Sequence, residues 1–182
     1  MSESPRTVTA DSQSAGKLGV SSLVLLAVLL AAGFILNFTV GNALAIVGIK
    51  PQFIIAAYAL AILLTNANAG QAAVFGLISA AVIQLTTSIP GLNFFTELTG
   101  ALTMCGLCKL SMKVGGRDIT PLVATFVTTL VSGLLFAVCG NLIMGAAIGT
   151  VVVKLPIVLG TACFNAIVVQ ALVIPLRKVL KR

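Results

Sequence analysis

Hydrophobic positions along the chain fall into six long, nearly uninterrupted runs separated by short polar or turn-forming segments. The runs show none of the period-2 alternation that membrane β-strands require, and a stretch such as SSLVLLAVLLAAGFILNF is continuously apolar. Continuous apolar runs of this kind are typical of helices that cross a bilayer. The pattern therefore predicts an all-α integral membrane protein with about six transmembrane helices in one bundle, over residues 18–38, 51–64, 71–87, 94–112, 121–144 and 151–174.

The first 17 residues differ from the rest because they are polar and rich in Ser and Thr. Such a segment buries too little apolar surface to fold, so residues 1–17 are predicted to form a disordered cytosolic tail. A secretory signal peptide fits poorly, since the following apolar run is longer than a signal core and lacks a convincing cleavage site. Residues 18–182 then form one six-helix transmembrane domain.

Composition supports the membrane prediction and excludes a water-soluble domain. Apolar residues make up 59% of the chain and charged residues only 8%, with a mean hydropathy of +1.17. The net charge of +7 does not indicate nucleic-acid binding, because the cations lie at segment ends without interleaved aromatics. No nucleic-acid partner is expected, whereas the lipid bilayer is an expected partner.

The basic residues predict the orientation of the bundle, since Lys and Arg near helix ends are retained in the cytoplasm. With six spans both termini share one side, and nine of the eleven cations fall on that side. The expected location is therefore a bacterial plasma membrane, with a multi-pass chain and both termini cytoplasmic.

Metal and enzyme chemistry find little support in the sequence. Cys105 and Cys108 have the spacing of half a metal or redox site, but the second half and any histidine are missing, so both are expected to pack as small apolar residues. Neither a metal nor another cofactor is predicted. The four acidic residues are too dispersed for an acid/base pair, and no Gly-x-x-x-x-Gly-Lys-Ser/Thr loop is present, so the chain is not expected to be an enzyme or to hydrolyse ATP.

Three charged residues lie on the predicted outer half of the bundle: Lys50, Glu97 and Lys154. One interpretation is structural, in which the lysines reach lipid headgroups and Glu97 caps a helix. The other is a polar pocket open to the outside, because charge within a membrane is costly and is usually kept for a partner or ligand. Helical spacing adds the pocket candidates Asn93, Asn141, Thr161 and Asn165, and the two lysines favour a ligand with a carboxylate or phosphate.

Ala27 and Ala31 are two small residues one turn apart in the first span, a spacing that lets another helix approach closely. Ala72, Gly76 and Ala80 repeat the pattern in the third span. Such faces mostly pack helices within one protein, and contact with a partner protein is the alternative.

Taken together, several segments resemble the substrate-binding S components of energy-coupling factor (ECF) transporters. The resemblance covers Lys17 to Arg182 and rests on the number of spans, Ala27-x-x-x-Ala31 and the segments Gly48 to Pro51 and Ser88 to Gly91. The last two segments look like those of members assigned to vitamins and to tryptophan. Gln52 departs from the acid that follows this proline in tryptophan-type members.

The resemblance implies an S component of an ECF-type ABC importer, which captures a vitamin or related micronutrient from outside and topples in the membrane to deliver it. The implied partners are a membrane coupling subunit, contacted through Ala27 and Ala31, and two cytosolic ATPase subunits. Pantothenate is the favoured ligand, followed by pyridoxine or a hydroxymethylpyrimidine compound. A solitary ion-coupled carrier is the alternative. The predicted substrate-binding residues are Lys50, Gln52, Asn93, Glu97, Asn141, Lys154, Thr161 and Asn165.

Overall fold

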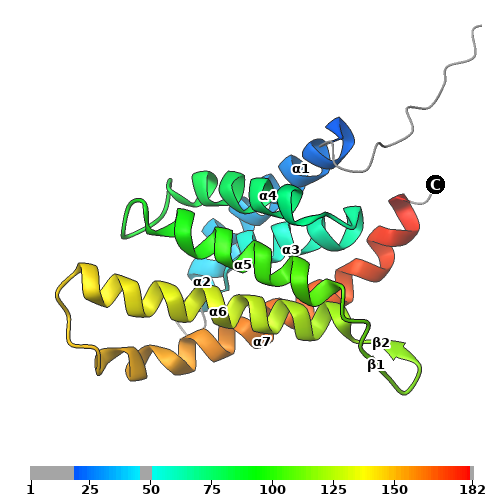
Figure 1. The fold of residues 1–182 in the computed structure, drawn as a ribbon. Helices are drawn as coiled ribbons and strands as arrows, with labels where there is room; N and C mark the ends of the chain where they lie inside the picture. The colour runs from blue at the N-terminus through cyan, green and yellow to red at the C-terminus, as the bar shows by residue number, and fades with distance from the viewer. Residues whose placement is uncertain (1–18, 46–50, 181–182) are drawn as a thin grey trace, which may run out of the picture.

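The fold of residues 19–45 and 51–180 is described by a computed structural model. It is all-α apart from one short β-hairpin (Figure 1). The elements in chain order are α1 (Val20–Leu36), the π-helix η1 (Asn37–Gly41), α2 (Asn42–Ala45), α3 (Phe53–Thr65), α4 (Ala69–Ile83), α5 (Leu92–Cys108), β1 (Lys113–Val114), β2 (Arg117–Asp118), α6 (Thr120–Ile143) and α7 (Thr150–Leu180). The predicted tail of residues 1–17 lies outside the described residues, as does Lys50.

Each of the six apolar segments predicted from the sequence contains a helix. Within the part of the chain that the structure describes, three helical segments are long and apolar enough to cross a membrane: Val20–Leu44, Thr120–Ile143 and Thr150–Leu180. α3 and α4 are shorter apolar helices of 13 and 15 residues. The architecture is therefore compatible with an all-α membrane protein, and the crossing of the bilayer by all six segments stays a prediction.

The shortness of α3 is explained by its place at the centre of the bundle. Every residue from Phe53 to Leu63 is buried, and α3 packs against α1, α4, α5 and α7. At 1.5 Å per residue it is shorter than a bilayer core of about 30 Å. Other helices surround α3 along its length, whereas Asn66 and Asn68, just after its end, are exposed.

The remaining helices form antiparallel neighbours around α3, with α4 beside α5, α5 beside α6 and α6 beside α7. The start of α1, the hairpin and the end of α7 lie at one end of the bundle, and the α4–α5 and α6–α7 connections lie at the other (Figure 1). We call these the terminal end and the connection end. Lys109, Lys113, Arg117, Arg177 and Lys178 belong to segments at the terminal end.

Close packing of α4 on α5 depends on Gly76. A Cβ atom at this position would lie 2.8 Å from both the Ala101 Cβ and the Glu97 carbonyl oxygen. Ala72 and Ala80 are fully buried on the same helix. This small-residue series therefore packs helices within the chain and leaves none of its surface for a partner.

The connection from residue 113 to 118 forms a β-hairpin with a two-residue turn. Gly115 and Gly116 have φ angles of 56° and 78°, the left-handed geometry that a type I′ turn requires and that glycine adopts without strain. Arg177 Nη1 lies 3.8 Å from Asp118 Oδ2, so the hairpin contacts the end of α7.

The predicted end of the last helix is wrong, because α7 continues through Pro175 to Leu180. Proline removes its own N–H bond and crowds the carbonyl four residues earlier, and Arg177 and Lys178, whose charges favour a helix C-terminus, offset part of this cost.

Candidate functional site

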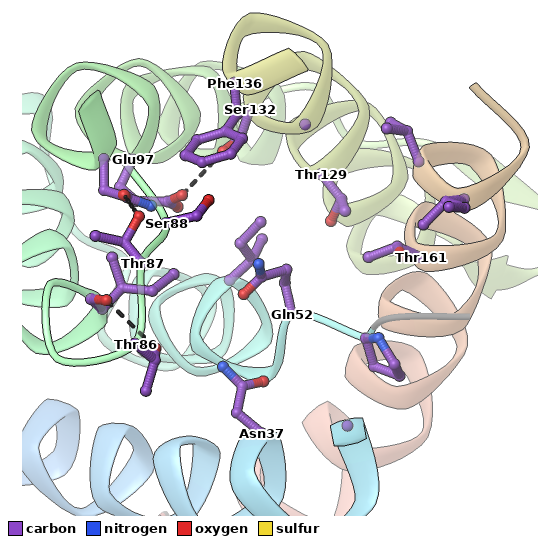
Figure 2. A pocket seen from close by; sticks show the side chains of 18 of the residues that line it. Asn37, Gln52, Thr86, Thr87, Ser88, Glu97, Thr129, Ser132, Phe136 and Thr161 are labelled. Atoms are coloured by element: carbon purple, nitrogen blue, oxygen red, sulfur yellow. Dashed lines mark hydrogen bonds between the residues drawn. The ribbon is translucent and has the colours of Figure 1, made fainter. Parts of the chain in front are cut away.

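A cavity of about 700 Å³ opens at the connection end of the bundle. Its walls come from η1, the start of α2, the start of α3, the α4–α5 connection, the start of α5, the second half of α6 and the start of α7. In Figure 2 the labelled side chains surround a central space, with Glu97 and Ser132 on one side and Thr161 on the opposite side. Polar side chains from segments far apart in the sequence thus meet in one site.

Glu97 is the acidic residue of the cavity and lies in the second turn of α5. Its side chain is only 3% exposed. The Ser132 hydroxyl on α6 donates to Glu97 Oε1 over 3.0 Å, the contact drawn as a dashed line in Figure 2. Glu97 Oε2 has no hydrogen-bond partner among the described residues. One carboxylate oxygen is therefore held by Ser132, and the other is buried in the wall, where the Tyr58 hydroxyl on α3 interacts with this carboxyl group.

Lys154 brings a positive charge to the cavity from the start of α7. Its Nζ donates to Asn141 Oδ1 over 2.6 Å, and Asn141 Nδ2 donates to Thr150 Oγ1 over 2.7 Å. Asn141 is buried behind the lining, so it positions Lys154 and joins the end of α6 to the start of α7. An ammonium has three donor hydrogens, which leaves Lys154 with donors for a ligand.

Asn165 is fully buried on α7 and does not line the cavity. Its Nδ2 donates to the Gln52 carbonyl oxygen over 3.2 Å and lies 3.4 Å from Thr129 Oγ1. Gln52 itself lines the cavity at the start of α3 (Figure 2). Asn165 therefore fixes the backbone that presents Gln52, and acts as a positioning residue.

The residues predicted from the sequence thus divide into three groups. Gln52, Asn93, Glu97, Lys154 and Thr161 line the cavity, which brings them together. Asn141 and Asn165 lie one layer behind it and hold lining segments in place. Lys50 lies outside the described residues. A role of any of them in binding stays a prediction.

The sequence reasoning missed Asn37, which lies where α1 passes into the π-helix η1. Its Oδ1 accepts a hydrogen bond from the Phe53 backbone N–H over 2.8 Å, which satisfies one of the free donors at the start of α3. Asn37 also lines the cavity (Figure 2). The sequence does contain a signal for Asn37 as a site residue, because it is an amide inside an otherwise apolar span.

The sequence predicts a third span that continues to Thr87 and a turn at Pro90-Gly91, but α4 ends at Ile83, and Thr86, Thr87 and Ser88 line the cavity. Thr87 Oγ1 donates to Asn93 Oδ1 over 2.6 Å, and the Gly91 N–H donates to Gln84 Oε1 over 3.0 Å. These bonds fold the connection over the start of α5. Hydroxyl residues beside a Pro-Gly turn predict a loop but not the direction in which it folds.

Ala27 and Ala31 do not line the cavity and lie on an exposed face of α1. Val24 and Val28 beside them are 56% and 62% exposed. The described chain therefore leaves this apolar face uncovered. Contact with a partner through the two alanines stays a prediction.

The cysteine pair lies away from the cavity, in the last turns of α5 near the terminal end. Cys105 is buried, and its Sγ lies 3.3 Å from the Ala67 carbonyl oxygen, as a weak S–H donor would. Within residues 19–45 and 51–180 no group of three His, Cys, Asp or Glu side chains is placed to hold a metal ion.

The fold and the site define the class of this protein: it is an all-α protein with a polar cavity at one end of the helical bundle. Its helices are compatible with a membrane protein. Comparison with protein-family models, curated proteins and solved structures found no match.

Proposed function

We propose that the chain is the substrate-binding S component of an ECF-type ABC importer in a bacterial plasma membrane. The observation that carries the proposal is the cavity of about 700 Å³, lined by Glu97, Lys154 and several amides and hydroxyls at one end of an otherwise apolar bundle. Its size suits a vitamin or a similar small molecule, since ligand pockets of about 300–1,000 Å³ are usual.

The distribution of charge supports uptake from outside. The basic segments gather at the terminal end, opposite the cavity, and basic helix ends are retained in the cytoplasm. In the proposed orientation both termini are cytoplasmic and the cavity opens to the exterior. A ligand is then captured outside the cell.

Dependence on partners follows from what the sequence lacks and what α1 exposes. The chain has no phosphate-binding loop, so ATP hydrolysis falls to two cytosolic ATPase subunits. The exposed apolar face with Ala27 and Ala31 is the proposed contact with the membrane coupling subunit. The role of this chain is non-catalytic: it binds the ligand and presents it.

The alternative is a solitary ion-coupled carrier, and one observation favours it. Glu97 is a buried acid on the cavity wall, and buried acids within membranes often bind the coupling proton or ion. Uptake driven by an ion gradient in the absence of ATPases distinguishes this alternative.

The proposal is tested by purifying the chain in detergent and identifying by mass spectrometry the small molecule that stays bound. Titration with pantothenate, pyridoxine and the hydroxymethylpyrimidine compound then measures affinity. Saturable one-to-one binding that competes with the bound molecule is expected. A chain that binds no small molecule under either procedure contradicts the proposal.

A further inference from the structure

A second pocket, of about 320 Å³, lies at the terminal end of the bundle, and we call it the terminal pocket. Its walls come from the end of α3 and its connection to α4, the end of α5 and the residues just after it, Asp118 of the hairpin, the start of α6, and Arg177 on α7. The hairpin and the end of α7 mark this end of the bundle in Figure 1. Among the described residues, none lines both this pocket and the cavity at the connection end, so the two are separate sites.

Two cations line the terminal pocket with donors to spare. Lys109 directly follows the last residue of α5, and Arg177 lies near the end of α7. Within residues 19–45 and 51–180 neither side chain donates a hydrogen bond to the protein, since the 3.8 Å between Arg177 Nη1 and Asp118 Oδ2 exceeds hydrogen-bond distance. An ammonium has three donor hydrogens, and a guanidinium can hold two oxygens of one phosphate group. The two cations are therefore suited to a phosphate.

Asp118 is the acid on the pocket wall, and its charge does not cancel the positive charge around it. Its Oδ1 accepts a hydrogen bond from the Thr120 backbone N–H over 3.0 Å, so the carboxylate is already engaged by the start of α6. The described segments 109–118 and 177–178 together carry five cations and this one acid. An anion that enters the pocket therefore meets a positive potential.

Apolar side chains beside the two cations favour a lipid as the source of the phosphate. Leu110, next to Lys109, is 56% exposed, and Ile174, three residues before Arg177 on α7, is 55% exposed. Acyl chains cover such side chains, whereas free phosphate leaves them uncovered. Basic pockets between helices on the cytoplasmic side of membrane proteins bind anionic headgroups, and the terminal end is the cytoplasmic side in the predicted orientation.

We propose that the terminal pocket binds the phosphate of an anionic membrane lipid through Lys109 and Arg177, with the acyl chains against Leu110 and Ile174. Inorganic phosphate offers the two cations the same chemistry without acyl chains, so the test separates these two sources. The inference does not rest on the proposed function, because it uses none of the residues that line the cavity at the connection end. A headgroup held by both cations joins the end of α5 to the end of α7, so bound lipid also stabilises the fold.

The test measures lipid binding by the purified full chain in detergent. Native mass spectrometry compares phosphatidylglycerol with phosphatidylcholine of the same acyl chains, and a third arm adds inorganic phosphate in tenfold excess over the lipid. A pocket variant, Lys109→Gln with Arg177→Gln, removes both lining cations. The matched control, Lys113→Gln with Lys178→Gln, removes two cations at the same end that do not line the pocket.

Wild type is expected to bind phosphatidylglycerol about tenfold or more tightly than phosphatidylcholine, because each cation near an anionic headgroup contributes about 1 kcal/mol. The pocket variant is expected to lose this preference and the control to keep it, and inorganic phosphate is expected not to displace the lipid. Phosphatidylglycerol should also raise the thermal unfolding midpoint of wild type and control but not of the pocket variant. If the pocket variant fails to fold, Lys109→Gln alone keeps the Arg177–Asp118 contact and should weaken binding about threefold or more.

Equal affinity of wild type for the two lipids overturns the inference. An equal loss in the pocket variant and the control overturns it too, because the attraction then belongs to the whole basic end and not to this pocket. Displacement of the lipid by inorganic phosphate makes free phosphate the ligand and overturns the lipid assignment. These outcomes leave the proposed function untouched, since the ligand of the cavity at the connection end is measured separately.

Discussion

At the scale of single residues, the cavity separates groups that face the ligand space from groups that hold them. Lys154 lines the cavity while Asn141, buried behind it, accepts a hydrogen bond from its ammonium. Asn165 stands behind Gln52 in the same way. Amides in this second layer reduce the number of positions that the lining groups sample, which lowers the cost of ordering them on binding.

The sequence predicted these polar residues only as a stripe along one face of a helix. The spacing of Lys154, Thr161 and Asn165 indicated one face of a helix; Thr161 and Asn165 are buried, and Lys154, although exposed, lines the cavity. Which of them reaches the cavity depends on the angle of α7 against α3 and α6, and that angle is set by packing between helices. The hydrophobic pattern of the sequence alone does not determine this angle.

Substitution of Lys154 by alanine tests the electrostatic part of the site. If the ligand carries a carboxylate, Lys154→Ala is expected to weaken binding about tenfold or more, since hydrogen bonds to charged groups contribute about 1.5–3 kcal/mol. Titration of the identified ligand measures the change, with Lys178→Ala at the other end of α7 as the matched control. Unchanged affinity in both Lys50→Ala and Lys154→Ala contradicts an anionic ligand group.

At the scale of elements, the apolar runs predicted every main helix, because burial in lipid or in a helical core demands continuous apolar sequence. Helix ends were less predictable. The π-helix at Asn37–Gly41 and the passage of α7 through Pro175 depend on tertiary contacts, such as the bond from the Phe53 N–H to Asn37 and the position of Arg177 beside Asp118.

The contact between α4 and α5 gives a prediction about stability. Gly76→Ala places a Cβ atom 2.8 Å from Ala101 Cβ and from the Glu97 carbonyl oxygen, so the two helices must move apart. A loss of about 1–3 kcal/mol is expected from such overpacking. Thermal unfolding in detergent measures it.

The matched control is Gly106→Ala on α5, where an added Cβ meets nothing within 4 Å. This change is expected to be neutral or stabilising by up to about 1 kcal/mol, because alanine favours a helix. If Gly76→Ala is as stable as Gly106→Ala, the close approach of α4 and α5 described above is wrong.

The hairpin at the terminal end predicts a pH effect. Hydrogen bonds from Thr120 lower the pKa of the Asp118 carboxyl, and Arg177 adds a smaller effect in the same direction. A lowered pKa in the folded state means that the stabilisation is present above the unfolded pKa of about 3.9 and is lost as pH falls through the folded value.

Asp118→Asn is therefore expected to reduce the loss of stability between pH 6 and pH 3 relative to wild type. The difference should stay below about 1 kcal/mol, because the pair is 41% and 43% exposed and solvent screens it. Unfolding midpoints of the two proteins across this pH range measure the effect. Parallel curves contradict a role for the Asp118 carboxylate in stability.

At the scale of the whole molecule, the bundle has two unlike ends and an apolar flank. One end carries the hairpin and most of the basic residues that the structure describes, the other carries the cavity, and α1 exposes Ala27 and Ala31 between them. The sequence predicted this polarity from the placement of Lys and Arg. It did not predict the depth or shape of the cavity, which depends on where loops such as Thr86 to Ser88 fold.

The exposed face of α1 predicts a separation between ligand binding and assembly. In the proposed importer, Ala27→Leu and Ala31→Leu are expected to leave ligand affinity unchanged and to reduce co-purification of the coupling subunit at least tenfold. Ala171→Leu, on an exposed face of α7, is the matched control and should retain the partner. Equal recovery of the coupling subunit with all three variants places its contact elsewhere.

The proposed importer as a whole is tested most directly by uptake into proteoliposomes. The chain is reconstituted alone, and with the coupling and ATPase subunits that co-purify with it, and accumulation of the labelled ligand identified by mass spectrometry is followed with and without ATP inside the vesicles or outside them. The account predicts uptake only with the partner subunits and ATP on the cytoplasmic side. Accumulation by this chain alone, driven by an ion gradient, would contradict it.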